Sequence, residues 1–389
     1  MKIAFDCSLV PGQRGGIGQY SYNLARALSR IDRRNEYTLY ILMTARRAKA
    51  AAGQETGLPD GGNFRVVWKT IPFPFQLFRY AKLPGTGFRE YMLGDLDVDV
   101  VHSNTFCVPR FRDKKKKVVV TVYDASVATH PECHRRGNIA HCLGGIKDAV
   151  KYADAIIAIS EHTKADLVRL FDAPPELITV TQLAAGSEYH PVRDAGLLKA
   201  ARDKYDLPES YILFVGSLEP RKNVKTLLKA YAMMRKAFRE EFPLVIAGGK
   251  GWMNSEIPGM VEELGIEGSV TFAGYIDSAD IAAVYSGASV FVYPSLYEGF
   301  GLPILEAMSC GTPVITSNVS SMPEVAGDAA ELVTPTDAQG LASALEGMLG
   351  DPGRRAEMGR RGMERAAAFS WERCARETLE VYRKVVENR

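Results

Sequence analysis

Short runs dense in valine and isoleucine recur along this chain, and helical patterns separate them. Within each run the apolar residues are contiguous instead of alternating, which is typical of strands buried on both faces. Strands of this kind alternating with helices predict an α/β fold with parallel sheets covered by helices. The runs are KIAFD, YTLYIL, FRVVW, DVVHS, KVVVTVYD, AIIAIS, ITVT, YILFVGS, PLVIAGG, SVTFAGY, SVFVYPS, TPVITSN and AELVTP.

A polar, proline-containing stretch over residues 191–208 interrupts this pattern, which then restarts with a new strand. The chain has 389 residues, more than one typical hydrophobic core holds. We therefore expect two doubly wound, Rossmann-like domains, residues 1–190 and 191–370, facing each other across a cleft. The last segment, residues 371–389, is predicted to be an amphipathic helix with Ser370 at its N-cap.

Composition and charge exclude several functional classes. The formal net charge of +2 argues against a general nucleic-acid binder. No apolar run approaches the roughly 18 residues that a membrane span needs, and the N-terminal run is too short for a signal peptide. The six cysteines lack the spacing of a disulfide scaffold, so we expect reduced thiols and a cytoplasmic location.

The stretch YEGFGLPILE, between a predicted strand and a predicted helix, holds two acids, Glu298 and Glu306. Glu298 is placed in the loop and Glu306 about one turn into the helix, where both could face one crevice. Carboxylates accept hydrogen bonds from the paired hydroxyls of sugars and riboses. Acids near a helix N-terminus also favour the helix dipole, so a purely structural role stays open.

A second strand-to-helix loop, VGSLEPRKN, holds Arg221 and Lys222 at the predicted start of a helix. Two cations beside free helix amides form a strong site for a diphosphate, although a solvated basic turn is also common. Cations for phosphates and carboxylates for hydroxyls together match the recognition of a nucleotide-sugar.

A third loop, PGQRGGIGQYS, places Gly15, Gly16 and Gly18 before a helix, where backbone amides could approach a diphosphate. The dinucleotide-binding fingerprint fails here, because Ser21 stands where its third glycine belongs and the glycines lie well past the strand. The failure argues against a dinucleotide-dependent oxidoreductase, the first rival class.

With these motifs in place, the chain resembles the family-4 retaining glycosyltransferases of the GT-B fold, including mannosyltransferases of polysaccharide biosynthesis. The resemblance extends over nearly the whole chain. It is carried by GGIGQYSYNLARAL, AISEHTKADL, VGSLEPRKN, VTFAGYI, the two glutamates with their spacing, and GTPVITSNVSSMPEVAGDAA.

The resemblance implies residue roles. Glu306 would bind the ribose, and Glu298 would bind the transferred hexose. Arg221 and Lys222 would neutralise the leaving diphosphate, as a metal ion does in other enzymes. The resemblance therefore implies neither a metal nor another cofactor. The final helix would complete the first domain. The remaining donor-binding residues would be Gly15, Gly16, Gly216, Ser217, Tyr275, Gly299, Phe300, Gly301 and Leu302.

On the acceptor side this chain departs from its relatives, which often carry a His-Asp pair where it has Tyr123 and Asp124. Asp124 could still orient hydroxyls and is included with Arg221, Lys222 and Glu298 as a catalytic candidate. Tyr123 lacks an imidazole. His102, at a strand end, completes the acceptor-side candidates.

Two stretches of the sequence contain residue types that can bind metals, but their positions favour structural roles. The acids of DLDVDVVHS precede a strand and so lie at its amino end, away from the expected site. CHRRGNIAHC, residues 133–142, lacks a usual zinc spacing. The aromatic and basic stretch PFPFQLFRYAKLPGTGFREYML, residues 72–93, could lean on the inner face of a membrane or pack as an ordinary helix.

The sequence therefore predicts a cytoplasmic hexosyltransferase that uses a nucleotide-sugar. GDP-mannose is the preferred donor by resemblance, with UDP-glucose and UDP-N-acetylglucosamine as alternatives. The acceptor is expected to be a glycan or a polyprenyl-linked oligosaccharide. The second rival class is a non-catalytic sugar-nucleotide-binding protein, against which the complete set of Glu298, Glu306, Arg221 and Lys222 argues.

Overall fold

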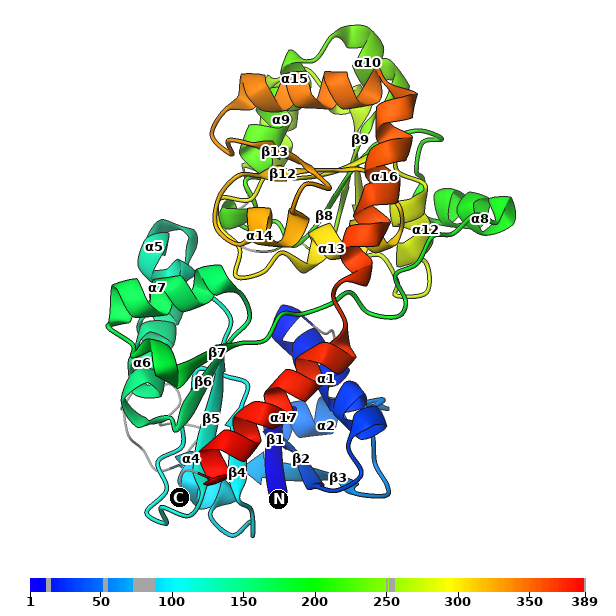
Figure 1. Cartoon of the computed structure of the whole chain (residues 1–389). Helices are drawn as coiled ribbons and strands as arrows, with labels where there is room; N and C mark the ends of the chain where they lie inside the picture. The colour runs from blue at the N-terminus through cyan, green and yellow to red at the C-terminus, as the bar shows by residue number, and fades with distance from the viewer. Residues whose placement is uncertain (12–14, 52–54, 73–87, 250, 252–255, 388–389) are drawn as a thin grey trace. The chain divides into compact units, whose positions relative to one another are not determined.

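The computed structural model describes residues 1–11, 15–51, 55–72, 88–249, 251 and 256–387. Its internal contacts divide the chain into two units. The first unit comprises Met1–Leu183 together with Ser370–Arg389, and the second comprises Ala184–Phe369. Each unit is an α/β structure built on one parallel sheet (Figure 1).

The first unit contains a seven-stranded sheet in the order β3-β2-β1-β4-β5-β6-β7, with every paired strand parallel. The chain runs outward from β1 in one direction and then returns to β4 on its other side, so the strand order reverses between them. The strands are β1 (Lys2–Asp6), β2 (Glu36–Thr44), β3 (Phe64–Ile71), β4 (Val100–Ser103), β5 (Lys117–Val122), β6 (Ala155–Ala158) and β7 (Ile178–Val180).

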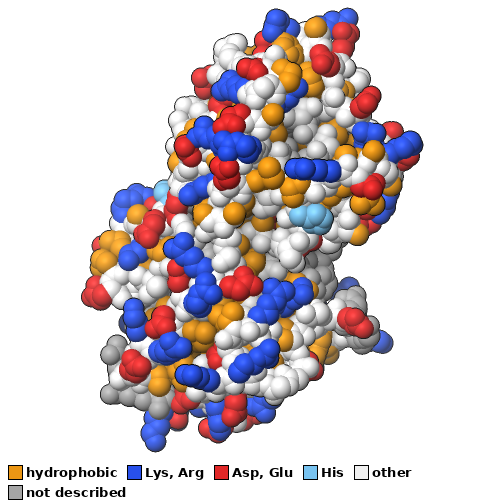
Figure 2. All heavy atoms as spheres, turned by 45° about the vertical axis from the view of Figure 1, so that its right-hand side comes forward, with side chains coloured by type: hydrophobic (Ala, Val, Ile, Leu, Met, Phe, Trp, Pro, Cys, Tyr) orange, Lys and Arg blue, Asp and Glu red, His pale blue; other side chains and the backbone are white. Residues whose placement is uncertain are grey.

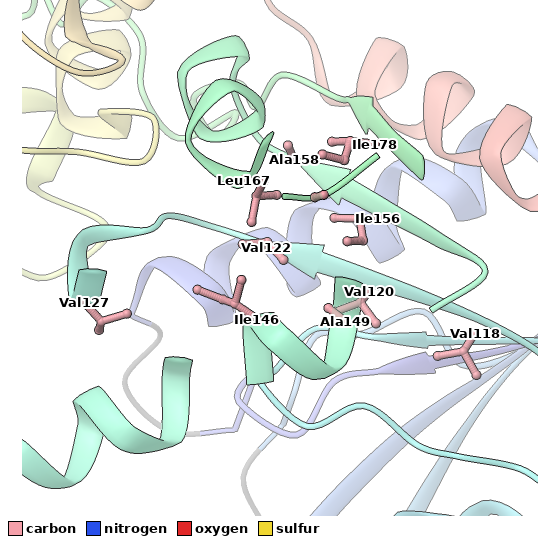
Figure 3. Packing of buried hydrophobic residues seen from close by; sticks show 11 residues of the cluster. Val118, Val120, Val122, Val127, Ile146, Ala149, Ile156, Ala158, Leu167 and Ile178 are labelled. Carbon is pink, nitrogen blue, oxygen red and sulfur yellow. The ribbon is translucent and has the colours of Figure 1, made fainter. Parts of the chain in front are cut away.

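The helices of the first unit are α1 (Gly16–Ile31), α2 (Ala45–Ala51), α4 (Phe88–Leu93), α5 (Ser126–Thr129), α6 (Arg136–Tyr152), α7 (Glu161–Phe171) and α17 (Trp371–Glu387), with short 3-10 turns η1 (Pro131–Cys133) and η2 (Pro175–Leu177). One core cluster joins β5, β6 and β7 to α6 and α7 through close-packed aliphatic side chains (Figure 3). Because these strands are buried on both faces, their apolar residues are contiguous in the sequence.

Helix α17 packs along α1 and against β5 and β6, so the end of the chain completes the first unit. Its start is capped as predicted, because the Ser370 hydroxyl accepts a hydrogen bond of 3.1 Å from the Arg373 amide. The buried face of the helix includes Trp371, Cys374, Leu379 and Tyr382.

The second unit contains a six-stranded parallel sheet in the order β10-β9-β8-β11-β12-β13. Its order reverses between β8 and β11, as in the first unit. The strands are β8 (Ile212–Val215), β9 (Leu244–Ala247), β10 (Val270–Gly274), β11 (Val290–Tyr293), β12 (Val314–Ser317) and β13 (Glu331–Val333). The prediction of two doubly wound α/β sheets is thus confirmed.

The helices of the second unit are α8 (Ala195–Tyr205), α9 (Val224–Met233), α10 (Lys236–Glu241), α11 (Ile257–Glu263), α12 (Ile281–Ser286), α13 (Leu302–Ser309), α14 (Met322–Ala326), α15 (Ala338–Leu349) and α16 (Pro352–Ala367), with 3-10 turns η3 (Pro220–Lys222) and η4 (Glu267–Ser269).

Charges of both signs are interspersed over the face shown in Figure 2, without a large field of one sign. Among the helices that the structure describes, none combines the length and the apolar character that crossing a bilayer requires. Most of the aromatic and basic stretch 72–93 lies outside the described residues, which resume at α4.

Candidate functional site

The candidate site of the second unit lies where the strand order reverses between β8 and β11. Ligands of open α/β sheets bind at the carboxyl ends of the strands at such a point. The loop that follows β8 carries Arg221 and Lys222, and the loop that follows β11 carries Glu298. The fold thus brings two distant loops of the sequence together at this edge of the sheet.

A carboxylate lies between two cations at the centre of this site. Glu298 forms ion pairs of 2.8 Å with both Arg221, through Oε2, and Lys222, through Oε1. The Glu298 side chain is only 8% exposed, and those of Arg221 and Lys222 are 14% and 12% exposed. We call these three residues the charge triad.

The hydroxyl of Tyr293, the last residue of β11, forms hydrogen bonds to two residues of the charge triad. It donates to Glu298 Oε1 at 3.0 Å and accepts a hydrogen bond from the Lys222 ammonium. Sequence reasoning missed this residue, although a tyrosine at the carboxyl end of a strand, five positions before an acid, was a usable signal.

The electrostatics of the charge triad reflect burial and pairing. Burial alone would raise the pKa of Glu298, but the charges of Arg221 and Lys222 outweigh it and lower that pKa to about 2. Burial also lowers the pKa of Lys222, and Glu298 partly offsets this effect. Glu298 is therefore an anion at every physiological pH.

The two cations do not begin the helix after β8, so that part of the prediction is wrong. They lie on η3, and α9 starts only after Asn223, whose φ of 58° is left-handed. The Asn223 side-chain amide donates to the carbonyls of Pro294 and Pro335. These bonds pin the turn to two neighbouring loops, so η3 is held against the loop that carries Glu298.

Backbone contacts also shape the loop after β8. The β9 loop passes so close that a Cβ at Gly248, whose φ is +131°, would lie 2.2 Å from the Gly216 carbonyl oxygen. The Ser217 hydroxyl donates to Glu219 at 2.6 Å, and the Glu219 carboxylate lies 3.7 Å from the Arg221 guanidinium. Ser217 is thus linked to the charge triad through Glu219, and the donor-binding roles of Gly216 and Ser217 stay predictions.

Glu306 lies on α13 in a different environment from Glu298. Its Oε2 accepts a hydrogen bond of 3.1 Å from the Tyr285 hydroxyl, and Tyr189 is a second hydrogen-bond partner. Burial raises the pKa of Glu306 to about 7, against the lowering effect of the two tyrosines. The pKa values of the two glutamates are thus shifted in opposite directions. Glu298 stays ionised at physiological pH, whereas Glu306 titrates near neutral pH.

The loop that enters α13 is held by side-chain hydrogen bonds to its backbone. Gly301 has a φ of 103°, and the Ser321 hydroxyl lies 2.8 Å from each of the Glu298 and Phe300 carbonyl oxygens. Gly299 and Phe300 are buried, and Leu302 begins the helix. Tyr275, which follows β10, is 54% exposed at the same edge of the sheet.

In the first unit, Gly15 precedes α1 as predicted, whereas Gly16 is the first residue of the helix and Gly18 is buried within it, so the prediction that all three glycines precede the helix is wrong. Gly15 is the N-cap residue of α1, and Gly15 and Gly16 are both exposed with open space where a side chain would stand. Deeper in the helix, Ser21 accepts a hydrogen bond from the Asn104 side chain. The position that fails the dinucleotide fingerprint is therefore a polar anchor of α1 to the end of β4.

The acceptor-side candidates differ in accessibility. Asp124 is half-buried, and its Oδ1 accepts hydrogen bonds from the amide and the hydroxyl of Ser126, the first residue of α5. Tyr123 is 8% exposed, packs edge-on against Tyr20, and donates to the Asn104 carbonyl. Of these two residues, only Asp124 is exposed enough to contact a ligand.

His102 is a structural residue of the core, which corrects its proposed acceptor role. It is fully buried, and its two ring nitrogens bond to the Tyr382 hydroxyl at 2.6 Å and the Thr121 hydroxyl at 2.7 Å. Burial lowers its pKa to about 3, so the ring is neutral. Its function is to tie β4 to β5 and α17.

The patterns set aside as metal sites have structural partners. Asp97 pairs with Lys2, the first residue of β1, and Asp95 pairs with Lys69 of β3. In the part of the chain that the structure describes, no three His, Cys, Asp or Glu side chains converge as a metal site would require.

Comparisons with known proteins agree along the whole chain. The family model "Glycosyltransferase Family 4" matches residues 14–183, and "Glycosyl transferases group 1" matches residues 199–365. The O-antigen chain mannosyltransferase B of Escherichia coli is 32% identical over 386 residues, which cover 98% of this chain and 100% of the relative.

Solved structures extend the agreement to the fold. The sucrose-phosphate synthase of Thermosynechococcus elongatus superimposes with a TM-score of 0.78 at 24% identity over 100% of both chains. The Anabaena protein HepE, solved in complex with UDP-glucose, gives 0.74 at 18% identity over 99% of this chain and 100% of its own. The chain belongs to the family-4 glycosyltransferases, retaining hexosyltransferases with the GT-B fold.

Proposed function

We propose that this protein transfers mannose from GDP-mannose, with retention, to a glycan or a polyprenyl-linked oligosaccharide. The identity to an O-antigen chain mannosyltransferase over 98% of this chain and 100% of the relative supports mannose as the transferred sugar and a glycan as the acceptor. A shorter match, 32% identical over 239 residues, is to a serotype-specific mannosyltransferase of Escherichia coli. That match covers 61% of this chain and 29% of the relative.

The observation that carries the proposal is the charge triad at the reversal of the strand order. Arg221 and Lys222 are suited to neutralise the leaving diphosphate, because they are buried and already oriented by Glu298. Fixed cations act more strongly in a site with little water than in bulk solvent. In this proposal they stabilise the charge that develops as the glycosidic bond to the phosphate breaks.

The two glutamates divide the remaining recognition. Glu306, with its tyrosine partners, binds the ribose hydroxyls, and Glu298 binds the hexose. Backbone near Tyr275 contacts the base, and the segment from Gly299 to Leu302 contacts hexose and phosphate. Neither glutamate acts as the acid or nucleophile of a glycosidase. The departing phosphate instead assists deprotonation of the acceptor.

In the first unit, Gly15 and Gly16 approach the phosphates, and Asp124 orients hydroxyls of the acceptor. Their exposed or half-buried positions support these roles. We place the protein in the cytoplasm, with peripheral contact at the inner face of the membrane where a polyprenyl-linked acceptor would lie.

A UDP-sugar is the second donor candidate, because HepE was solved with UDP-glucose. A thermal-shift panel with EDTA distinguishes the candidates, using GDP-mannose, GDP-glucose, UDP-glucose and UDP-N-acetylglucosamine. A ligand at 100 times its Kd stabilises the folded state by about 2.7 kcal/mol. A selective shift with GDP-mannose supports the proposal, and a selective shift with a UDP-sugar replaces its donor.

Turnover separates an enzyme from a non-catalytic binding protein. Nucleoside diphosphate released from the best-bound donor, with candidate acceptors present, should be detected and should depend on Arg221. Absence of turnover with every donor and acceptor tried, despite tight binding, would favour the non-catalytic alternative.

A further inference from the structure

The charge triad has an unusual balance for a site that is to receive a phosphate group. Each of its two cations is already paired at 2.8 Å with the single carboxylate of Glu298. Glu219 adds a second carboxylate 3.7 Å from Arg221, so the four charges of these residues sum to zero. An incoming anion therefore meets a compensated site.

Glu298 lies between the two cations and accepts hydrogen bonds from donors that a phosphate would need. A carboxylate and a phosphate oxygen offer the same kind of acceptor to Arg and Lys donors. The Glu298 carboxylate is an anion throughout the physiological range, so it competes with any second anion for these donors. Binding of a diphosphate must either displace Glu298 from a cation or accept its repulsion at close range.

We propose that Glu298 is an internal counter-ion of this site, which holds Arg221 and Lys222 when no diphosphate is bound and takes them back after transfer. The inference rests on the proposed function, in which a nucleotide-sugar brings both a diphosphate and a hexose. The hexose hydroxyls give the displaced carboxylate a new partner. The nucleoside diphosphate product has no hexose, so Glu298 returns to the cations and favours its release.

This exchange makes a prediction opposite to that for an ordinary binding residue. A site whose competent state is only partly populated binds with a correspondingly weakened apparent affinity. Removing the counter-ion therefore strengthens binding of a bare diphosphate. The same change removes the hexose contact, so it does not strengthen binding of the nucleotide-sugar to the same extent.

Inorganic pyrophosphate is the direct probe, because it carries neither a base nor a sugar. Calorimetric titration of the full chain, with EDTA and constant ionic strength, compares the wild type with Glu298→Gln. We expect the variant to bind pyrophosphate at least about tenfold more tightly, which corresponds to about 1.4 kcal/mol. Equal or weaker binding by Glu298→Gln overturns the proposal.

Glu219→Gln is the matched control, because it also removes one negative charge beside Arg221 but leaves both ion pairs of Glu298 intact. We expect the affinity of Glu219→Gln for pyrophosphate to stay within about threefold of the wild-type affinity. This change is well below the gain of about tenfold expected for Glu298→Gln. An equal gain in both variants would mean a general charge effect and would also overturn the proposal.

Glu298→Gln leaves two buried cations, and a second pair of variants covers the case in which it does not fold. Lys222→Met and Lys222→Met/Glu298→Gln differ only in the counter-ion, and the double variant buries one cation fewer than Glu298→Gln. The double variant should bind pyrophosphate more tightly than Lys222→Met. The wild type could also bind no nucleotide-sugar while Glu298→Gln binds pyrophosphate more tightly than the wild type. That result would overturn the proposed donor but support the counter-ion role of Glu298.

Discussion

Tyr285 and Glu306 are joined by a hydrogen bond of 3.1 Å in which the phenol donates to Oε2 of the carboxylate. The rings of Tyr285 and Tyr189 meet edge-on, with centroids 5.9 Å apart, so Glu306 is bordered by aromatic surface. This surrounding removes water from the carboxylate and raises its pKa to about 7. Glu306 is therefore expected to change charge near neutral pH.

The stability contributed by Glu306 should depend on pH. Its pKa is raised above the unfolded value of 4.5, so the contribution is complete below pH 4.5 and is lost as pH rises through about 7. Relative to Glu306→Gln, whose side chain does not titrate, the wild type should lose up to about 3 kcal/mol of unfolding free energy. Urea denaturation of both proteins across this range measures the loss. A constant difference would contradict the raised pKa.

Arg221→Met and Lys222→Met should each lower turnover of the donor by about 10²–10³-fold, because each removes a cation aimed at the leaving diphosphate. The release of nucleoside diphosphate measures this effect. Lys225→Met is the control: Lys225 lies one turn away, is 51% exposed and pairs with Glu256, so its loss should be nearly neutral. Similar rates of nucleoside diphosphate release in all three variants would show that the two cations do not assist departure of the leaving group.

Gly248→Ala should disturb the loop that precedes the cations, because the added methyl would meet the Gly216 carbonyl and the φ of +131° is strained for alanine. We expect a loss of stability of more than about 1 kcal/mol and weaker binding of pyrophosphate. Gly249→Ala is a close control, since it has open space at its Cβ. Thermal denaturation and calorimetry should separate the two variants, and identical behaviour would show that the contact is unimportant.

Tyr382→Phe should weaken the attachment of α17, because it leaves one nitrogen of buried His102 without its hydroxyl partner. The expected cost is about 1–3 kcal/mol in unfolding free energy, measured in urea. Tyr22→Phe, at a partly buried hydroxyl that bonds to Arg26 on α1, should cost about 0.5 kcal/mol or less. Pyrophosphate affinity should stay unchanged in both variants, since neither residue belongs to the charge triad.

The sheets were predictable because burial on both faces leaves a local signal. Each strand of AIIA or LVIA type is a contiguous apolar run that needs no knowledge of its neighbours. The helix α17, observed over Trp371–Glu387, was predictable for the same reason, since its periodicity and its N-cap serine are local. The placement of Glu298 in a loop and Glu306 on a helix followed from the same reading.

The partners of these residues were not predictable, because they depend on pairings between distant segments. Glu298 meets Lys222 across 76 positions, and His102 meets Tyr382 across 280. The histidine ends a strand in a manner typical of a site residue, yet the helix at the far end of the chain covers it. Local pattern also misplaced the start of α9, since the left-handed turn at Asn223 is fixed by carbonyls of two other loops.

The division of the chain has a consequence for its synthesis. The second unit is continuous, whereas the first unit consists of Met1–Leu183 and the last segment, Ser370–Arg389. On the ribosome, all of Ala184–Phe369 is made before α17 emerges, so the domain begun first is the last to be completed. Until α17 has emerged, the face of α1 that receives it remains uncovered. Premature termination that removes α17 would therefore damage the amino-terminal unit rather than the second unit.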